Sequence, residues 1–533
     1  MNSIFTRLNY SFLSEYSKRF TDLRDVLYIM NLAQSKDGHS YPTDKELLAI
    51  EAEMSIGSGF FQSKNKVVNF VYSLEPNLQN SIKARIGEDI ESVTLETLIS
   101  VLIEYGLPLH LALKTSRHDS NSPSVLKFKA DPNPFKPLKP YQAMVVQRAN
   151  ELLKPNFSRC IIQMPTGSGK TRTAIELVIN NIRDNKDVLW IANSEELINQ
   201  AFTTFCDSWS HLANLESTAV NYLTAEIPNI EFGPIFHATT IQSLLDIQSR
   251  TAQALASRTT ELGLVVFDEA HQAPAPRYRE VLERYTSNPK TKLLGLTATP
   301  GRSFNQVQEN VAFAELFHGN IVRIEPPSAN MTTMDYLRSE GVLSYVKQHI
   351  VENEWLEIDS LEIEESLNTL PDLNYELLSR IGKNAERNYL IIKTLTRLIE
   401  DGKSVLYFAP SVHQSLLVTT ILAHKGIQAA HIDGSTLNRA HIIRKFHSGE
   451  IRILSNFGVL HTGFDAPGTD VVFIGRPTKS IILYSQMIGR GLRGPSVGGK
   501  EYCELYTVQD NIKGLISNDE IASYFDDYFS NNR

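Results

Sequence analysis

Seven consecutive residues have the types and the order of a phosphate-binding loop. They are Pro165, Thr166, Gly167, Ser168, Gly169, Lys170 and Thr171, and they stand between an apolar, strand-like run at 160–164 and a helix-like segment. Glycines in such a loop let backbone N–H groups approach anionic oxygens at the positive end of a helix. Lys170 would then neutralise the β and γ phosphates of a nucleotide, and the Thr171 hydroxyl would bind Mg²⁺. The first glycine of the usual pattern is replaced by Met164, so a glycine-rich turn with an incidental lysine is the alternative at this point.

An acidic pair stands further along the chain, where the apolar run 262–267 ends in Asp268, Glu269, Ala270 and His271. Ligands collect at the carboxyl ends of neighbouring parallel strands in open α/β sheets, so Asp268 is placed to hold Mg²⁺. Glu269 is placed to orient and deprotonate an attacking water. A strand that ends in two acids is by itself more often a surface feature, but its pairing with the loop favours a site for nucleotide hydrolysis.

Two further groups of residues complete the set that could act on a nucleotide. Thr297 and Thr299 end another strand-like run, and their spacing of two puts both hydroxyls on one side, where they can bond to the acidic pair and to His271. Arg490 and Arg493 are three residues apart and share one face of a helical turn. A guanidinium supplied from a second domain would stabilise the charge on a transferring phosphoryl group. A basic helix surface is the alternative for this arginine pair.

Two stretches of the chain alternate short β-branched runs with helix-like segments, which is typical of a parallel sheet covered by helices. The strand-like runs are 160–164, 188–193, 235–240, 262–270 and 292–299 in the first stretch, and 404–410, 427–434, 451–458, 470–477 and 501–508 in the second. We therefore predict an α/β fold with two doubly wound parallel-sheet domains preceded by an α-helical domain. The predicted limits are 1–120 for the α-helical accessory domain, 121–137 for a linker, 138–325 for the first sheet domain, 326–383 for a linker or small insertion, and 384–533 for the second sheet domain.

The composition is that of an ordinary globular protein, since 42% of the 533 residues are hydrophobic and 21% are charged. It excludes a collagen-like, coiled-coil or wholly disordered chain. The three cysteines are far apart, which argues against a disulfide framework and against a zinc finger. No apolar run approaches the ~20 residues that span a bilayer, so we expect a cytoplasmic protein with no membrane partner. The net charge of −8 gives no bulk attraction to nucleic acid, so any such binding must use a local groove.

The motifs, taken in order, resemble those of superfamily 2 helicases and translocases of the DEAH type. They are LKPYQ (138–142), MPTGSGKT (164–171), LWIANSEELINQA (189–201), DEAH (268–271), GLTATP (295–300), VLYFAPS (405–411), ILSNFGVLHTGFDAPGTDVVFIGRPTKS (453–480) and QMIGRGLR (486–493). Their wording is most similar to the branch that contains type I restriction motor subunits and the RadD-like and XPB-like helicases. The resemblance implies two RecA-like domains with ATP and Mg²⁺ bound between them, and DNA, whether single-stranded, duplex or branched, as the track.

The resemblance also implies roles for residues outside the loop and the charged motifs. Gln142 matches the glutamine that recognises adenine, although a polar residue at a helix start is the alternative. Gly463 and Asp465 match a motif of the second domain that senses nucleotide and nucleic acid across the cleft. The residues that match positions holding the sugar-phosphate backbone are Asn193, Ser194, Glu195, Thr239, Thr240 and Ser411. Their hydroxyls and amides suit backbone contact without base readout.

The leading hypothesis is an ATPase stimulated by nucleic acid that couples hydrolysis to movement on DNA, in DNA repair or in anti-phage defence by restriction. One alternative is an ATP-driven clamp or switch that recruits a nuclease or another effector without processive unwinding. A second alternative is an RNA helicase, because such motors grip the backbone and distinguish RNA by its 2′-hydroxyls and shape. The role of residues 1–120 stays open between a packing scaffold and a module that binds a partner or a DNA structure.

Overall fold

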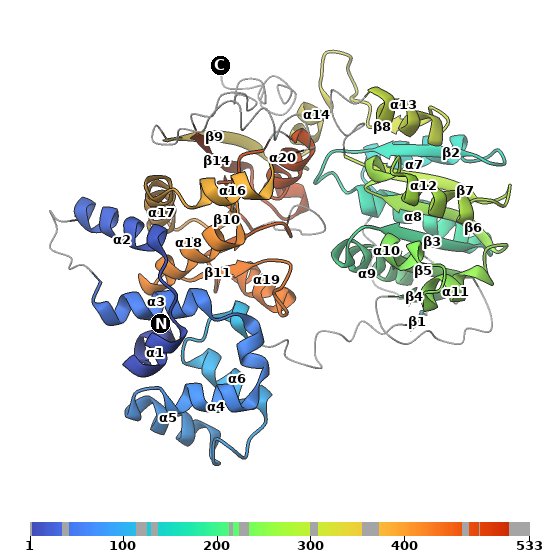
Figure 1. Cartoon of the computed structure of the whole chain (residues 1–533). Coiled ribbons are helices and arrows are strands. Elements are labelled where there is room, and N and C mark those ends of the chain that lie inside the picture. Colours follow the sequence, from blue (N-terminus) through green and yellow to red (C-terminus); the bar gives the residue numbers. More distant parts are fainter. Residues whose placement is uncertain are drawn as a thin grey trace.

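Two parallel sheets covered by helices and a helical N-terminal region make up the protein (Figure 1). The computed structural model describes residues 3–34, 42–112, 125–128, 137–212, 217–222, 234–298, 307–353, 372–460, 468–478 and 480–510. The predicted fold class is confirmed, with two α/β domains and a helical segment before them in the chain. None of the helices within these ranges is long and apolar enough to cross a membrane.

The first sheet has the strand order β1-β4-β5-β3-β6-β7-β2-β8, and all its neighbours are parallel except β1 and β4. Its strands are β1 (Val125–Phe128), β2 (Arg159–Gln163), β3 (Asp187–Ala192), β4 (Ser217–Asn221), β5 (Ile235–Thr240), β6 (Leu262–Asp268), β7 (Lys292–Thr297) and β8 (Ile321–Arg323). Its helices are α7 (Pro140–Leu152), α8 (Lys170–Arg183), α9 (Glu195–Leu212), α10 (Ile241–Leu245), α11 (Arg250–Ala256), α12 (Pro276–Tyr285) and α13 (Val307–Leu316). The five runs predicted as strands here become β2, β3, β5, β6 and β7.

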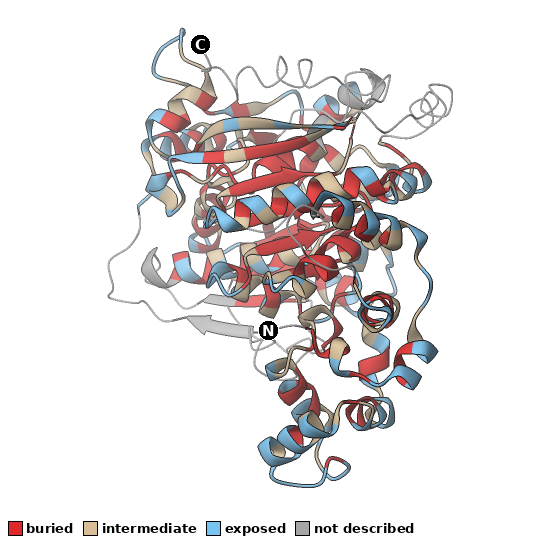
Figure 2. Cartoon of the chain, turned by 90° about the vertical axis from the view of Figure 1, so that its left-hand side faces the viewer, coloured by how far each residue is buried: buried red, intermediate tan, exposed pale blue. Residues whose placement is uncertain are grey.

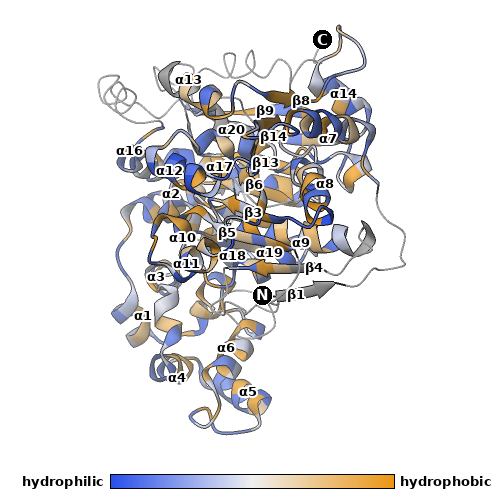
Figure 3. Cartoon of the chain, turned by 90° about the vertical axis from the view of Figure 1, so that its right-hand side faces the viewer, coloured by the Kyte–Doolittle hydropathy of each residue, from blue (hydrophilic) through white to orange (hydrophobic). Residues whose placement is uncertain are grey.

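Burial on both faces explains why the central strands are continuous apolar runs in the sequence. Every residue of β3, β5 and β6 is buried, and hydrophobic strands lie between more hydrophilic helices in Figure 3. Gly295 in β7 is required by space, because a Cβ there would lie 2.7 Å from the ring of Phe317 and 2.9 Å from the Ala270 Cβ. This close packing holds the turn after β6, which carries the acidic pair, against β7.

The second sheet has the order β11-β12-β10-β13-β14-β9, with every pair parallel. Its strands are β9 (Tyr345–Asn353), β10 (Val405–Phe408), β11 (Ala429–Ile432), β12 (Ile453–Asn456), β13 (Val471–Ile474) and β14 (Tyr502–Asp510). The helices of this half are α14 (Thr333–Ser339), α16 (Tyr375–Gly382), α17 (Ala385–Glu400), α18 (Val412–His424), α19 (Arg439–His447) and α20 (Ile481–Ile488), with the 3₁₀ turn η5 (Pro495–Val497). All five runs predicted as strands in this half are confirmed, and Figure 2 shows these buried strands beneath partly exposed helices.

Two segments predicted to be linkers contain edge strands. Residues 326–383 contribute β9, which pairs in parallel with the whole of β14. Residues 121–137 contribute β1 to one edge of the first sheet. Most side chains of β9 are only half-buried or exposed, so this strand lacks the apolar run that marks a central strand. The other predicted domain limits stay predictions.

The N-terminal region is helical, as predicted. It contains η1 (Ile4–Arg7), α1 (Tyr10–Tyr16), α2 (Thr21–Gln34), α3 (Asp44–Ser55), η2 (Ser58–Gln62), α4 (Lys64–Tyr72), α5 (Pro76–Ile86), α6 (Leu95–Glu104) and η3 (Leu109–Leu111). Its core includes a cluster of edge-to-face rings from Phe5, Phe12, Phe60 and Phe70, with neighbouring centroids 5.5 to 6.4 Å apart. The region therefore has an apolar interior of its own.

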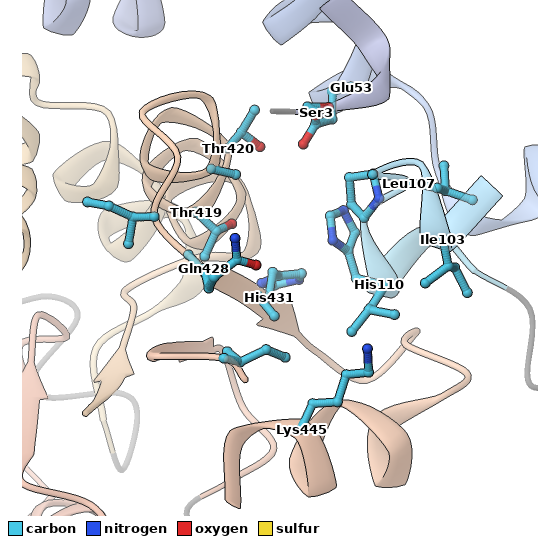
Figure 4. A pocket seen from close by; sticks show the side chains of 18 of the residues that line it. Ser3, Glu53, Ile103, Leu107, His110, Thr419, Thr420, Gln428, His431 and Lys445 are labelled. Carbon is cyan, nitrogen blue, oxygen red and sulfur yellow. The ribbon is translucent and has the colours of Figure 1, made fainter. Parts of the chain in front are cut away.

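The helical region is docked on the second sheet domain. Helix α2 packs against α17, α3 against α18, and η3 against the edge strand β11. Two carboxylate–imidazole contacts join the partners: Asp22 lies 2.5 Å from Nε2 of His413, and Glu53 lies 3.2 Å from Nε2 of His424. Between them lies a cavity of about 210 Å³, across which His110 faces His431 with ring centroids 5.7 Å apart (Figure 4). The described part of the helical region is thus packed against the second sheet domain.

Candidate functional site

The loop between β2 and α8 has the backbone shape that a phosphate cradle needs. Gly167 and Gly169 have φ values of +93° and +85°, which residues with a side chain rarely adopt. Helix α8 begins directly after them, with Gly169 as its N-cap residue and Lys170 in the first turn. Helix α7 holds the loop, because the Tyr141 hydroxyl donates to the Ser168 carbonyl at 2.7 Å. Backbone N–H groups at this helix start therefore lie beside the cavity described below.

A side chain at either glycine would also displace a neighbouring side chain. A Cβ on Gly169 would lie 2.5 Å from Nε2 of Gln142, and a Cβ on Gly167 would lie 2.9 Å from Cδ2 of Leu343. The second of these contacts comes from the segment that connects the two sheet domains. The loop is thus packed between α7 on one side and the interdomain connection on the other.

Lys170 lies between the two acids that end β6. Its Nζ is 3.2 Å from Oδ1 of Asp268 and 3.6 Å from Oε1 of Glu269. Burial alone would lower the pKa of the Lys170 ammonium, but the two carboxylates outweigh it and raise this pKa. Lys170 is therefore held as a cation, next to the helix start, at the place where the sequence predicts phosphate.

The two carboxylates differ although they are neighbours. Burial raises the pKa of Asp268 above its usual value, and the charge of Lys170 only partly opposes this. Burial acts in the same direction on Glu269, but the charges of Lys170, His271 and Arg490 outweigh it and hold the Glu269 pKa below its usual value. Glu269 is therefore ionised at neutral pH, as a proton acceptor must be.

An uncommon backbone conformation and several polar contacts orient Glu269. Glu269 has a φ of +56°, an uncommon conformation for a residue with a side chain and one found often at functional sites. Its N–H donates to Oδ1 of Asp268 at 3.0 Å, and its Oε2 is 3.5 Å from Nδ1 of His271. The Thr297 hydroxyl is also 3.5 Å from that imidazole nitrogen. The structure thus joins the ends of β6 and β7 through Glu269, His271 and Thr297.

The two arginines of the second domain lie next to the glycine loop and the acidic pair. Arg493 Nη1 donates to the carbonyl of Gly167 at 2.6 Å, so it contacts the loop directly. Arg490 is 8% exposed, and its charge acts on both Lys170 and Glu269. Both guanidiniums line one cavity with the loop and the acidic pair.

The connection between the domains is bonded to the segment that follows these arginines. Ser344 Oγ donates to the carbonyls of Arg493 and Lys500 at 2.7 and 2.6 Å. The Gly494 N–H donates to the Val342 carbonyl at 2.9 Å. The connection, the loop and the arginine segment therefore form one packed unit.

The cavity enclosed by these groups has a volume of about 380 Å³. Its lining suits a nucleoside triphosphate, because the cations of Lys170, Arg490 and Arg493 and the start of α8 face one space. Asp268 and Thr171 offer oxygen donors of the kind that Mg²⁺ prefers. Among the described residues, no cluster of three or more His, Cys, Asp or Glu side chains could hold a metal alone. A Mg²⁺ here would share its coordination with phosphate and water, which is how this ion is usually bound.

Gln142 lies at the start of a helix and also lines the cavity. It is 6% exposed in the first turn of α7, where its Oε1 accepts the Lys139 N–H at 2.9 Å. It also lines the cavity beside Gly169. The helix-start role is therefore present in the structure, and adenine recognition stays a prediction.

The residues predicted to hold a nucleic-acid backbone lie at the carboxyl ends of strands, but they differ in exposure. Asn193 and Ser194 are half-buried and Glu195 is exposed after β3, while Thr239 at the end of β5 is fully buried. Thr240 accepts from the Ser243 N–H as the N-cap of α10. Ser411 is fully buried and caps α18, accepting the Gln414 N–H at 3.1 Å. Thr299, Gly463 and Asp465 lie outside the described residues.

Several residues of the cavity are not among the predicted site residues. Those that line it in addition to the predicted set are Pro137, Lys139, Tyr141, Arg172, Leu197, Gln200, Thr204 and Val497. Tyr141 and Lys139 lie within the motif LKPYQ, so their closeness to Gln142 in the sequence could have identified them. Lys139 also bridges the domains, since its Nζ is 3.1 Å from the Ser496 hydroxyl. Leu197 and Gln200 lie within the motif 189–201, on α9, and Pro137, Arg172, Thr204 and Val497 lie outside the quoted motifs.

Comparison with known families agrees with this arrangement. The family described as "Type III restriction enzyme, res subunit" matches residues 135–302, and "Helicase conserved C-terminal domain" matches residues 390–494. The chain belongs to helicase superfamily 2. The first match covers the loop and the acidic pair, and the second covers both arginines.

Individual relatives are distant. The chain is 26% identical over 379 residues to IRC3 of Saccharomyces cerevisiae, named as an ATP-dependent helicase, covering 67% of this chain and 49% of that protein. It is 25% identical over 407 residues to the endonuclease subunit of the type I restriction enzyme EcoKI of Escherichia coli, covering 67% of this chain and 33% of the subunit. It is 28% identical over 272 residues to the XPB helicase/translocase subunit of transcription and DNA repair factor IIH of Encephalitozoon cuniculi, covering 49% and 38%. The chain thus spans half or less of the length of these three relatives.

Proposed function

We propose that this protein is an ATP-dependent helicase or translocase that couples ATP hydrolysis to movement on DNA. The observation that carries the proposal is the convergence of Lys170, Asp268 and Glu269 from one sheet with Arg490 and Arg493 from the other on a single cavity. Such a site is complete only when the two domains are together. Hydrolysis can therefore be coupled to their relative movement.

Each charged group has a proposed part in hydrolysis. Lys170 and the N–H groups at the start of α8 bind the β and γ phosphates. Glu269, ionised by its surroundings, orients the attacking water and accepts its proton. Thr171 and Asp268 would hold Mg²⁺, which supplies charge neutralisation between the phosphates. Arg490 and Arg493 stabilise the charge that develops as the phosphoryl group is transferred.

DNA is the proposed track because two of the relatives carry names that tie them to it. One is the endonuclease subunit of a restriction enzyme and one belongs to a DNA repair factor. The same names support a role in DNA repair or in anti-phage defence by restriction, with a nuclease or another effector subunit as the partner. A clamp that recruits such an effector without unwinding would use the same ATP site.

The test is steady-state ATP hydrolysis by the purified protein, alone and with single-stranded, duplex or forked DNA and with RNA of matched sequence. We expect strong stimulation by one form of DNA, weaker stimulation by RNA, and loss of hydrolysis when Mg²⁺ is chelated. The variant Lys170→Ala should hydrolyse no ATP, because the phosphates lose their main cation. Lys154→Ala is the matched control, since Lys154 is exposed and lies outside the cavity.

The outcomes separate the candidate functions. Hydrolysis by Lys170→Ala at the wild-type rate would contradict the assigned site. Stronger stimulation by RNA than by any DNA would replace the DNA motor with an RNA helicase. Stimulation without strand displacement or translocation would favour the clamp.

A further inference from the structure

Helix α16 covers the predicted nucleic-acid contact Ser411. A Cβ placed on Gly382, at the end of α16, would lie 2.9 Å from the Ser411 hydroxyl and 3.1 Å from the Gln414 Cβ. Ser411 is fully buried, and its hydroxyl already accepts the Gln414 N–H. A strand that reached this end of the second sheet would therefore meet the outer face of α16 before it met Ser411.

The outer face of α16 has the side chains of a single-strand binding surface. The inner face is apolar, with Leu377, Leu378 and Ile381 buried. On the outside, Tyr375 is 59% exposed, and Arg380 and Lys383 are exposed beyond it. Within the helix itself, the acid that shares this face is Glu376. An aromatic ring followed by two cations is thus presented to solvent.

Tyr375 is held in place by groups that follow two strands of the second sheet. Its ring lies against Phe457, which follows β12, with centroids 6.0 Å apart at 63°. The Arg476 guanidinium, which follows β13, lies 5.6 Å from the Phe457 centroid. Arg476 is paired with Asp372 at 2.9 Å, so this nearby carboxylate is compensated. The Tyr375 ring is therefore oriented by its neighbours while more than half of its surface stays open.

We infer that α16 forms a binding site for single-stranded nucleic acid, in which Tyr375 stacks on a base and Arg380 and Lys383 contact phosphates. The inference rests on the proposed function and adds to it a contact that reads an unpaired base. Aromatic rings bind any base through its π face, but only a base that is not stacked in a duplex. The site is therefore selective for single strands over duplex.

The position of α16 suits a strand that crosses both domains. Helix α16 and helix α10 lie on the same side of the molecule in Figures 1 and 3. Helix α10 of the first domain is capped by Thr240, one of the predicted backbone contacts. A strand on this side would pass from α10 to α16 and would be gripped by both domains.

The test is the equilibrium affinity for a fluorescent single-stranded oligonucleotide, measured by anisotropy without ATP. Tyr375→Ala should bind roughly 5- to 150-fold more weakly, as expected for loss of one base–aromatic stack. Tyr375→Phe keeps the ring and should bind within about twofold of wild type. Lys383→Ala should reduce the slope of log Kd against log salt by about 0.7, the value for one phosphate contact on a single strand. Tyr28→Ala, at a tyrosine that is 55% exposed on α2, is the matched control.

An oligonucleotide with an abasic stretch separates stacking from a general loss of affinity. On this ligand, wild type and Tyr375→Ala should bind equally, because no base is there to stack. Equal binding of both proteins to the normal single strand, or an equal loss on duplex, would overturn the inference. The proposed function is tested separately by ATP hydrolysis, so a wild-type protein that binds single strands without stimulated hydrolysis would refute the motor and leave the stacking site in place.

Discussion

Replacement of Gly489 by alanine should separate nucleotide binding from domain closure. Gly489 follows α20 with a φ of −54°, a conformation that alanine adopts without strain. Its environment does not allow a side chain, because a Cβ would lie 2.5 Å from Cγ2 and 2.6 Å from Cβ of Thr166. Thr166 belongs to the loop of the first domain. The substitution therefore inserts one carbon between the two domains at the candidate site.

The size of the effect follows from this distance. Non-bonded carbons settle roughly 3.5–4.0 Å apart, so the domains must separate by roughly 1 Å at this point or distort by a similar amount. Overpacking of this kind costs roughly 1–3 kcal/mol. Since the arginines act only when the domains are together, that cost falls on the hydrolysing state. We expect kcat/KM to fall roughly 5- to 150-fold.

The assay pairs ATP hydrolysis at saturating nucleic acid with equilibrium binding of a fluorescent ATP analogue. Binding should change little, because the contacts from Lys170 and Gln142 are untouched. Gly434→Ala is the control, since a Cβ on Gly434 would meet nothing within 4 Å. The double variant Thr166→Gly/Gly489→Ala should recover part of the rate, because it removes the carbons that clash.

One result would refute this reasoning directly. If Gly489→Ala hydrolysed ATP as fast as Gly434→Ala, the approach of α20 to the loop would not belong to the active arrangement. The assignment of Arg490 and Arg493 to the transferring phosphoryl group would then lose its geometric basis.

Two further substitutions test separate parts of the structure. Arg490→Ala should slow hydrolysis while nucleotide affinity changes little, because its contact strengthens in the transition state; an equal fall in affinity, seen by analogue binding, would contradict its role. Asp187→Asn should destabilise the first domain by roughly 1.5–3 kcal/mol, measured by denaturant unfolding, because the buried Asp187 carboxylate loses its charge-assisted hydrogen bonds to the half-buried Arg258. Asp187 accepts from Arg258 at 2.7 Å and lies 3.1 Å from His237, and although burial alone raises its pKa, these partners bring the pKa below the usual value. A lowered pKa means that this stabilisation is present above about pH 4 and is lost as the pH falls through the folded-state pKa, so the wild type should lose its advantage over Asp187→Asn in acid; an advantage that persisted at low pH would disprove the pairing.

Much of the fold could be predicted because its central strands are buried on both faces. Runs such as 262–267 are apolar throughout, which is the pattern of a parallel strand covered on both faces. The candidate nucleotide site could also be predicted, because a phosphate-binding loop depends on local backbone shape and therefore on a short run of residues. The resemblance to superfamily 2 helicases then implied that Lys170, Glu269 and Arg490 would meet between the two domains.

The parts that the sequence did not predict depend on neighbours that are distant along the chain. Strand β9 is half-exposed at a sheet edge, and its pairing with β14 is fixed by backbone hydrogen bonds that leave no pattern in its side chains. The burial of Ser411 depends on α16, which comes from a segment interpreted as a linker. The exposure of Tyr375 likewise depends on packing, because a tyrosine in an amphipathic helix can lie on either the buried or the exposed face.

The packed unit made by the interdomain connection, the phosphate loop and the arginine segment has a mechanical consequence. Ser344 bonds the connection to Arg493, so a rotation of the domains about this connection would have its axis next to the candidate nucleotide cavity. Under rotation about a pivot, displacement grows with distance from the axis. A small rearrangement at the candidate cavity would therefore produce the largest displacement at the ends of the domains farthest from it. The helical region, which packs against β11, would move by more than the residues that line the cavity.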